Sequence, residues 1–101
     1  MSFQESIGSG EKTADAVIVA EQCWITALEV ISNGTNDARV ILYDNPAAAS
    51  GEVIWECTVV GADNYGGRVW TNPRRCDNGI YADVNGTGAS YIVEYIETPE
   101  R

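Results

Sequence analysis

Short runs rich in Val, Ile, Tyr, Trp and Thr recur along the chain from residue 13 onward, and clusters of Gly, Asn, Asp and Pro separate them. β-Branched and aromatic side chains favour extended strands, whereas the separating residues favour turns. Short antiparallel strands at this spacing are typical of a single all-β sandwich, either jelly-roll-like or immunoglobulin-like. The pattern predicts strands near residues 14–20, 23–31, 38–43, 52–60, 68–70, 80–84 and 90–97.

The run at 23–31 has an alternative interpretation as a helix. Ile25 and Leu28 lie at helical spacing. Several residues of the run are β-branched, however, and no capping residue precedes Cys23. The strand is favoured, and the helix stays as the alternative.

Alternation within the run 52–60 predicts which side chains form the core. Val53, Trp55, Cys57 and Val59 make a wholly apolar row, whereas the residues between them are mixed. Successive side chains of a strand point to opposite faces, so we expect this row to face the interior.

The turns beside the run 80–84 contain Asn-Gly and Gly-Thr-Gly steps. Such steps close tight connections in which φ becomes positive. We therefore expect Gly79, Gly86 and Gly88 to adopt backbone conformations that other residues resist.

The last run, 90–97, is apolar on both faces, with Tyr91 and Tyr95 on one of them. Such a strand needs a second cover, supplied either by the other sheet or by another subunit. An alternative is that the tyrosines line a rim and keep their hydroxyls in water. Tyr91 and Tyr95 are candidate assembly contacts on the subunit interpretation.

Residues 1–12 contain few large apolar side chains and two flexible Ser/Gly steps. They predict a flexible N-terminal arm ahead of a sandwich domain spanning residues 13–101. Phe3 and Ile7 are apolar side chains on this arm, and we expect them to contribute assembly contacts.

The composition removes several classes of function. A chain of 101 residues can build one hydrophobic core. Its 15 acidic and 6 basic residues give a formal charge of −9, which repels nucleic acid and anionic membranes, so neither is expected as a partner. The absence of His excludes Ser-His and Cys-His catalysis and His-ligated zinc within the chain.

Carboxylates are the remaining candidates for chemistry. Glu94 and Glu97 are three residues apart on a strand and point to opposite faces, and Glu52 and Glu56, four apart, are separated by about 13 Å. Neither pair forms a glycosidase dyad. The Asp-Asn-Gly and Asp-Val-Asn-Gly-Thr turns lack the terminal bidentate Glu of a calcium loop. We expect no enzyme activity, no catalytic residue, no metal and no cofactor.

The three cysteines form no C-x-x-C pair, and the first residues show neither a basic cluster nor an apolar run like that of a secretion signal. The protein is expected to be made in a reducing cytoplasm with free thiols. Cys23 and Cys57 fall on predicted strands, and Cys76 falls in a predicted loop. A bridge between Cys23 and Cys57 is the alternative.

One segment combines aromatic and basic side chains. Trp70, Arg74 and Arg75 surround Asn72 and Pro73 in a predicted loop. With Tyr65 they form a candidate ligand loop, because an aromatic platform beside guanidinium groups can hold a sugar or a carboxylate. The alternative is a solvated turn.

Two segments carry a resemblance to a known class of proteins. Residues 42–51 read LYDNPAAASG, and residues 76–93 read CDNGIYADVNGTGASYIV before a closing V-x-Y strand. Over about residues 20–96 the chain resembles small β proteins of tailed bacteriophage virions.

The resemblance implies a non-enzymatic structural component of a phage particle. The leading hypothesis is a capsid decoration (cement) protein on the capsid surface, assembled as a homotrimer after synthesis in the host cytoplasm. Its partner would be the major capsid protein or another virion protein. The alternative hypothesis is a carbohydrate-binding or host-adhesion module of a tail or fibre.

Overall fold

The computed structural model describes residues 6–97, and their regular structure is nearly all β. Within these residues, eight strands form two antiparallel four-stranded sheets, as the sandwich prediction requires. The short 3-10 helix η1 (Gly61–Asp63) connects β5 to β6. The strands are β1 (Ile7–Gly8), β2 (Ala16–Val19), β3 (Cys23–Ile31), β4 (Ala38–Tyr43), β5 (Val53–Val59), β6 (Tyr65–Cys76), β7 (Ile80–Asn85) and β8 (Ser90–Ile96).

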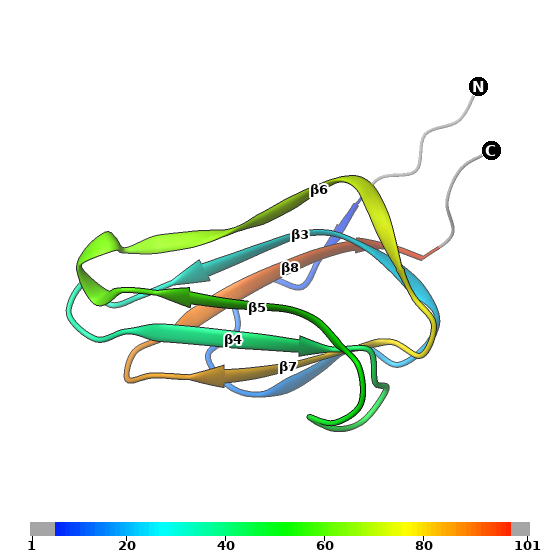
Figure 1. Cartoon of the computed structure of the whole chain (residues 1–101), viewed down its shortest axis with the longest axis horizontal. Coiled ribbons are helices and arrows are strands. Elements are labelled where there is room, and N and C mark those ends of the chain that lie inside the picture. Colours follow the sequence, from blue (N-terminus) through cyan, green and yellow to red (C-terminus); the bar gives the residue numbers. More distant parts are fainter. Residues whose placement is uncertain (1–5, 98–101) are drawn as a thin grey trace.

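The strand order identifies the type of sandwich. One sheet has the order β1-β8-β3-β6 and the other has the order β2-β7-β4-β5, so β1 pairs with β8, β2 with β7, β3 with β6 and β4 with β5. This is one long antiparallel hairpin rolled into two layers, which Figure 1 shows one above the other. The order is that of a jelly roll and differs from the immunoglobulin arrangement.

Most predicted strands are confirmed to within two residues, and the helix alternative for β3 is wrong. The exception is β6, which runs from residue 65 to residue 76, well beyond the predicted 68–70. Its pairing with β3 jumps from Ile25 opposite Arg74 to Ala27 opposite Val69. Residues 70–73 therefore bulge beside the single residue Thr26, and an irregular strand of this kind resembles a loop in sequence.

A second bulge changes the predicted core row. Leu42 pairs with Trp55, but the next residue of β4, Tyr43, pairs with Val53, so Ile54 is the extra residue. The bulge reverses the alternation, so Ile54 is buried while Val53 is 47% exposed. The prediction that Val53 faces the core is wrong. Trp55 faces the same side as the buried Leu42, but it lies on an edge strand and stays 38% exposed.

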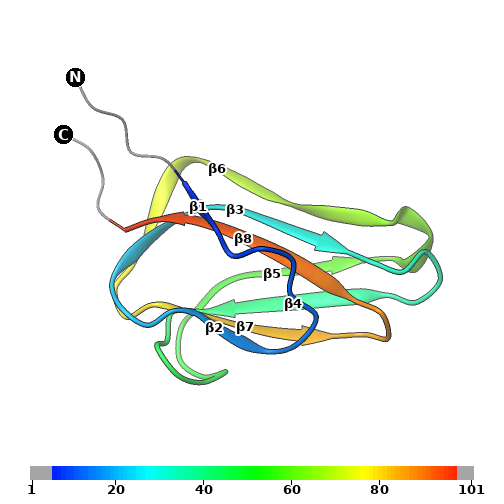
Figure 2. The ribbon, with the colours of Figure 1, turned by 180° about the vertical axis from the view of Figure 1, so that it is seen from behind.

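Residues 6–12 lie along the outer side of β8 and do not form a separate arm (Figure 2). Ile7 pairs with Tyr95, and the backbone of Lys12 exchanges two hydrogen bonds with Tyr91 at 2.8 and 2.9 Å. The Ser9 hydroxyl accepts the Val93 N–H at 2.9 Å. The expectation of a free arm is therefore wrong for residues 6–12, whereas residues 1–5 lie outside the described part of the chain.

The sheet β2-β7-β4-β5 covers one of the two apolar faces of the closing strand β8. Tyr91 and Val93 are fully buried in the core, and the Tyr91 hydroxyl donates a hydrogen bond to the carbonyl of Ala14 at 2.8 Å. Tyr95 is half-buried and packs against the same core. Tyr91 is therefore not a subunit contact, and the two tyrosines do not form a solvated rim.

The glycine prediction is confirmed. Gly79, Gly86 and Gly88 have φ values of 143°, 118° and 71°. All three lie in the region that favours glycine.

A buried carboxylate joins two turns that the sequence pattern treated separately. Asp44, at the end of β4, accepts backbone N–H groups from Asp77 at 3.0 Å, Asn78 at 2.8 Å and Gly79 at 3.3 Å. Three donors on one buried carboxylate fix the β6–β7 turn against the β4–β5 turn.

Replacing Asp44 with alanine should therefore lower the free energy of unfolding by about 3 kcal/mol, because three backbone donors lose a charged acceptor. Urea denaturation measures the change. The exposed Asp63 in η1 supplies the control, and Asp63→Ala should cost less than about 0.5 kcal/mol. Equal effects of the two substitutions would contradict the role of Asp44.

Candidate functional site: the β5–β6 edge

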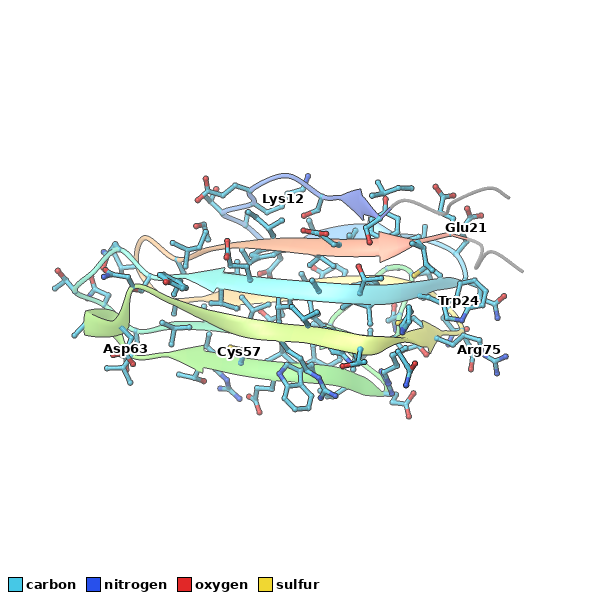
Figure 3. The ribbon with its side chains drawn as sticks, turned by 90° about the horizontal axis from the view of Figure 1, so that it is seen from above. Lys12, Glu21, Trp24, Cys57, Asp63 and Arg75 are labelled. Carbon is cyan, nitrogen blue, oxygen red and sulfur yellow. The ribbon has the colours of Figure 1, made fainter. Side chains whose placement is uncertain are left out.

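The two sides of the sandwich differ in how their edge strands are protected. On one side the edges are β1 and β2, of 2 and 4 residues, and on the other they are β5 and β6, of 7 and 12 residues. Short edge strands limit unwanted pairing, whereas long ones present rows of free backbone donors and acceptors. Figure 3 shows β5 and β6 side by side along one long side of the molecule. We call residues 53–76 the β5–β6 edge.

Exposed apolar side chains gather on this edge. Among the described residues, seven large hydrophobic side chains are exposed, and five of them belong to the β5–β6 edge. Such clustering marks a contact surface more often than scattered exposure does. The five are Val53, Trp55, Val60, Tyr65 and Val69, and the other two are Ile7 and Val17.

A guanidinium group lies against two tryptophan rings at the centre of the edge. Arg68 and Trp70 are two residues apart on β6 and face Trp55 on β5. The Arg68 Cζ atom is 4.1 Å from the ring centroid of Trp55 and 4.8 Å from that of Trp70, and the two centroids are 6.2 Å apart in an edge-to-face arrangement. Both arginine contacts are attractive because a cation is drawn to the face of an aromatic ring. The edge-to-face arrangement of the two rings is also favourable. We call these three residues the Trp-Arg-Trp cluster.

Arg68 differs from the other described arginines in its charge environment. Arg39 is paired with Glu56, Arg74 with Glu52 at 3.6 Å and Arg75 with Asp77 at 2.8 Å. Within residues 6–97, Arg68 has no carboxylate partner. Its exposed guanidinium therefore keeps N–H donors for an external acceptor, and a carboxylate matches their planar geometry.

An open groove of about 430 Å³ adjoins the edge on the outer face of the β1-β8-β3-β6 sheet. Tyr65 and Val69 border it on β6, and Ile92 and Glu94 border it on β8. The groove exists because Gly66 and Gly67 place no side chain between Tyr65 and Arg68. At Gly67, with φ of 154°, a Cβ atom would overlap the carbonyl oxygen of Leu28. The edge and the groove therefore form one continuous surface.

The structure does not bring the predicted ligand loop together. Tyr65 is 68% exposed and borders the groove at the start of β6, whereas Trp70 is only 8% exposed and lies beneath Arg68. Arg74 and Arg75 are near the other end of the strand and bind carboxylates of the chain itself. One terminal nitrogen of Arg74, Nη1, is buried and has no hydrogen-bond partner in the described part of the chain.

Of the predicted assembly contacts within residues 6–97, only Ile7 is exposed, and it lies on β1, away from the β5–β6 edge. Phe3 is outside the described residues. Sequence reasoning missed Arg68 and Val69 and assigned Trp55 to the core. The alternation of Arg68 and Trp70 was a usable signal, but nothing local in the sequence shows that β5 lies opposite them.

The described part of the chain gives no sign of a metal centre. Residues 6–97 contain no group of three or more His, Cys, Asp or Glu side chains able to hold a metal ion. No helix among them is long and apolar enough to cross a membrane.

Comparison with family models, with curated proteins and with solved structures finds no match.

Proposed function

We propose that this protein is a non-enzymatic structural component that binds a larger protein assembly through the β5–β6 edge. In the class that the sequence resembles, it would be a capsid decoration protein that contacts the major capsid protein and assembles as a homotrimer. One observation carries the proposal: exposed apolar side chains concentrate on the longest open edges, beside an arginine that has no ionic partner within residues 6–97.

The Trp-Arg-Trp cluster has the composition of an interface hot spot. Trp, Tyr and Arg dominate the binding energy of many interfaces, especially where they are held rigidly. The two rings hold Arg68 in place before a partner arrives, which reduces the entropy lost on binding. We propose that a carboxylate of the partner binds Arg68 while apolar groups cover Val69 and Tyr65.

The charge and the fold agree with a protein partner. A formal charge of −9 opposes contact with nucleic acid, so the genome is an unfavourable partner. Jelly rolls are common in viral capsid and lectin domains, although a fold alone does not determine a function. The candidate ligand loop does not form the aromatic surface that a sugar would need, because Arg68 covers the Trp70 ring. Tyr65 lies apart from it, at the start of β6 beside the groove.

The proposed action is mechanical. A protein that binds the assembled lattice but not the free subunit stabilises the shell by mass action. Contacts spread over neighbouring capsid subunits would add to the stability of the shell without any chemical step.

Two valines allow a matched test of this surface. Val69 is 78% exposed on β6, and Val17 is 44% exposed on β2, at the opposite side of the sandwich. Val69→Asp should weaken binding to purified particles at least about tenfold, because it places a charge in the apolar contact. Val17→Asp should leave binding unchanged, and both variants should melt within about 3 °C of the unsubstituted protein. Equal binding of the two variants would contradict the proposed surface.

Copy number separates a decoration protein from an adhesin. Quantitative mass spectrometry of purified particles should count about as many copies as there are lattice sites, and glycan arrays should show no binding. A few copies per particle with glycan binding would overturn the decoration proposal.

Analytical ultracentrifugation tests the homotrimer directly.

A further inference from the structure

Two of the three cysteines face each other across a strand pair. Cys23 is the first residue of β3 and Cys76 is the last residue of β6, and the two are direct partners in the register. Both are fully buried free thiols. The expectation that Cys76 lies in a loop is wrong, and Cys23 is opposite Cys76, not the Cys57 of the alternative bridge. Figure 3 shows the next pair, Trp24 and Arg75, at this end of the molecule and Cys57 midway along β5.

The geometry suits a covalent bond between these two sulfurs. Directly opposed residues of an antiparallel pair have Cα atoms about 4.5 to 5.5 Å apart. Disulfides span Cα separations of about 4.4 to 6.8 Å. The two thiols lie close enough to perturb each other's pKa, and the Cys76 thiol also contacts the carbonyl oxygen of Arg74 at 3.7 Å. The pair therefore needs little backbone movement to be bridged.

We propose that Cys23 and Cys76 are a site of oxidative modification that forms a disulfide between β3 and β6, while Cys57 remains a thiol. This inference is independent of the proposed function. It is also compatible with three free thiols in a reducing cytoplasm, because the bond would form only when the protein meets an oxidant.

The reaction balances with a small-molecule disulfide as the oxidant. The thiolate of one cysteine, Cys76 or Cys23, attacks one sulfur of that disulfide, forming a mixed disulfide and releasing one thiol. The sulfur of the other cysteine then attacks the protein sulfur of the mixed disulfide, loses its proton and releases the second thiol. Two protein thiols are thereby oxidised, and one external disulfide is reduced to two thiols.

The two thiols influence each other's ionisation. The neighbouring Cys23 thiol lowers the pKa of Cys76, whereas the Cys76 thiol and burial raise the pKa of Cys23. Either thiol can react first, because the opening that admits an oxidant also separates the two thiols. Since both are buried, the ends of β3 and β6 must separate briefly before the oxidant can reach them.

The bond would secure the strand that carries the candidate interface. It would join the start of β3 to the end of β6 and restrict residues 23–76 in the unfolded chain. A native bridge over a loop of this length should raise Tm by about 8 °C or more.

The full chain, first reduced and then incubated with oxidised glutathione, tests the proposal. After alkylation in denaturant, peptide mapping should find Cys23 linked to Cys76 and only Cys57 alkylated, with a higher Tm for the oxidised form. Incubation in low urea, which opens strand ends, keeps slow access from hiding the reaction. A Cys23–Cys57 bridge, or three alkylated cysteines after incubation in low urea, would overturn the proposal.

Substitutions supply the matched controls. Cys57→Ser should form the bridge and show the same Tm increase, whereas Cys76→Ala should show neither. Because a core substitution can impair folding, mapping of the unsubstituted chain remains the deciding measurement. Loss of the bridge in Cys57→Ser would contradict the assignment.

Discussion

Replacing Tyr91 with alanine should lower the free energy of unfolding by about 4 kcal/mol, a large fraction of the stability of a small domain. The ring is fully buried between the sheets, and its hydroxyl donates to the Ala14 carbonyl. Urea denaturation measures the loss. Tyr91→Phe, which removes only the hydrogen bond, should cost about 1 kcal/mol.

Tyr65→Ala is the matched surface control, since that ring is 68% exposed. Its cost should stay below about 1 kcal/mol. If Tyr91→Ala were as mild as Tyr65→Ala, Tyr91 would have to lie outside the core, where the sequence pattern had allowed a subunit contact.

The same side chain predicts a dependence of stability on alkaline pH. Burial is the main cause that raises the pKa of Tyr91 to about 12, from an ordinary value of 10. Above pH 10 the unfolded chain loses this proton before the folded protein does, so stability falls as the pH rises. The loss should reach about 1.4 kcal/mol by pH 11. Tyr91→Phe lacks this contribution, so its deficit of about 1 kcal/mol in the free energy of unfolding should disappear by pH 11.

Gly86→Val should destabilise the fold by about 4 kcal/mol, for two reasons that act together. Its φ of 118° is a conformation that β-branched residues strongly resist. An added Cβ atom would also overlap the carbonyl oxygen of Asp37, which is backbone and cannot move aside easily.

Gly8 provides the comparison, because a Cβ atom there would meet nothing within 4 Å. Gly8→Val should change the free energy of unfolding by less than about 0.5 kcal/mol. Thermal or urea unfolding of the two variants decides the matter, and a Gly86→Val protein as stable as Gly8→Val would show that the turn can relax.

Alternating apolar residues and turn-forming steps were enough to predict the sandwich and most strands, because both signals are local. The same reasoning failed at Val53 and Ile54, where one extra residue reverses the alternation. A bulge depends on the partner strand as well as on its own residues, so a single run cannot reveal it. The long bulge at residues 70–73 made a continuous strand resemble a loop for the same reason.

The candidate sites were harder to predict because they depend on which strands meet. Trp55 and Arg68 come from strands of different sheets, and Cys23 and Cys76 are opposed only because β3 pairs with β6. The sequence reasoning treated these residues one run at a time. The rolled hairpin pairs segments that lie far apart along the chain, and its order was not predicted.

The position of β8 between β1 and β3 also bears on how the protein is synthesised. The sheet β1-β8-β3-β6 cannot close until residues 90–96 have left the ribosome, although β1 and β3 emerge much earlier. Until then one hydrogen-bonding edge of β3 has no partner strand. An unpaired strand edge is a risk for aggregation during translation. A chain interrupted before Ser90 would keep that gap permanently, so truncated products should be targets for chaperones and proteases.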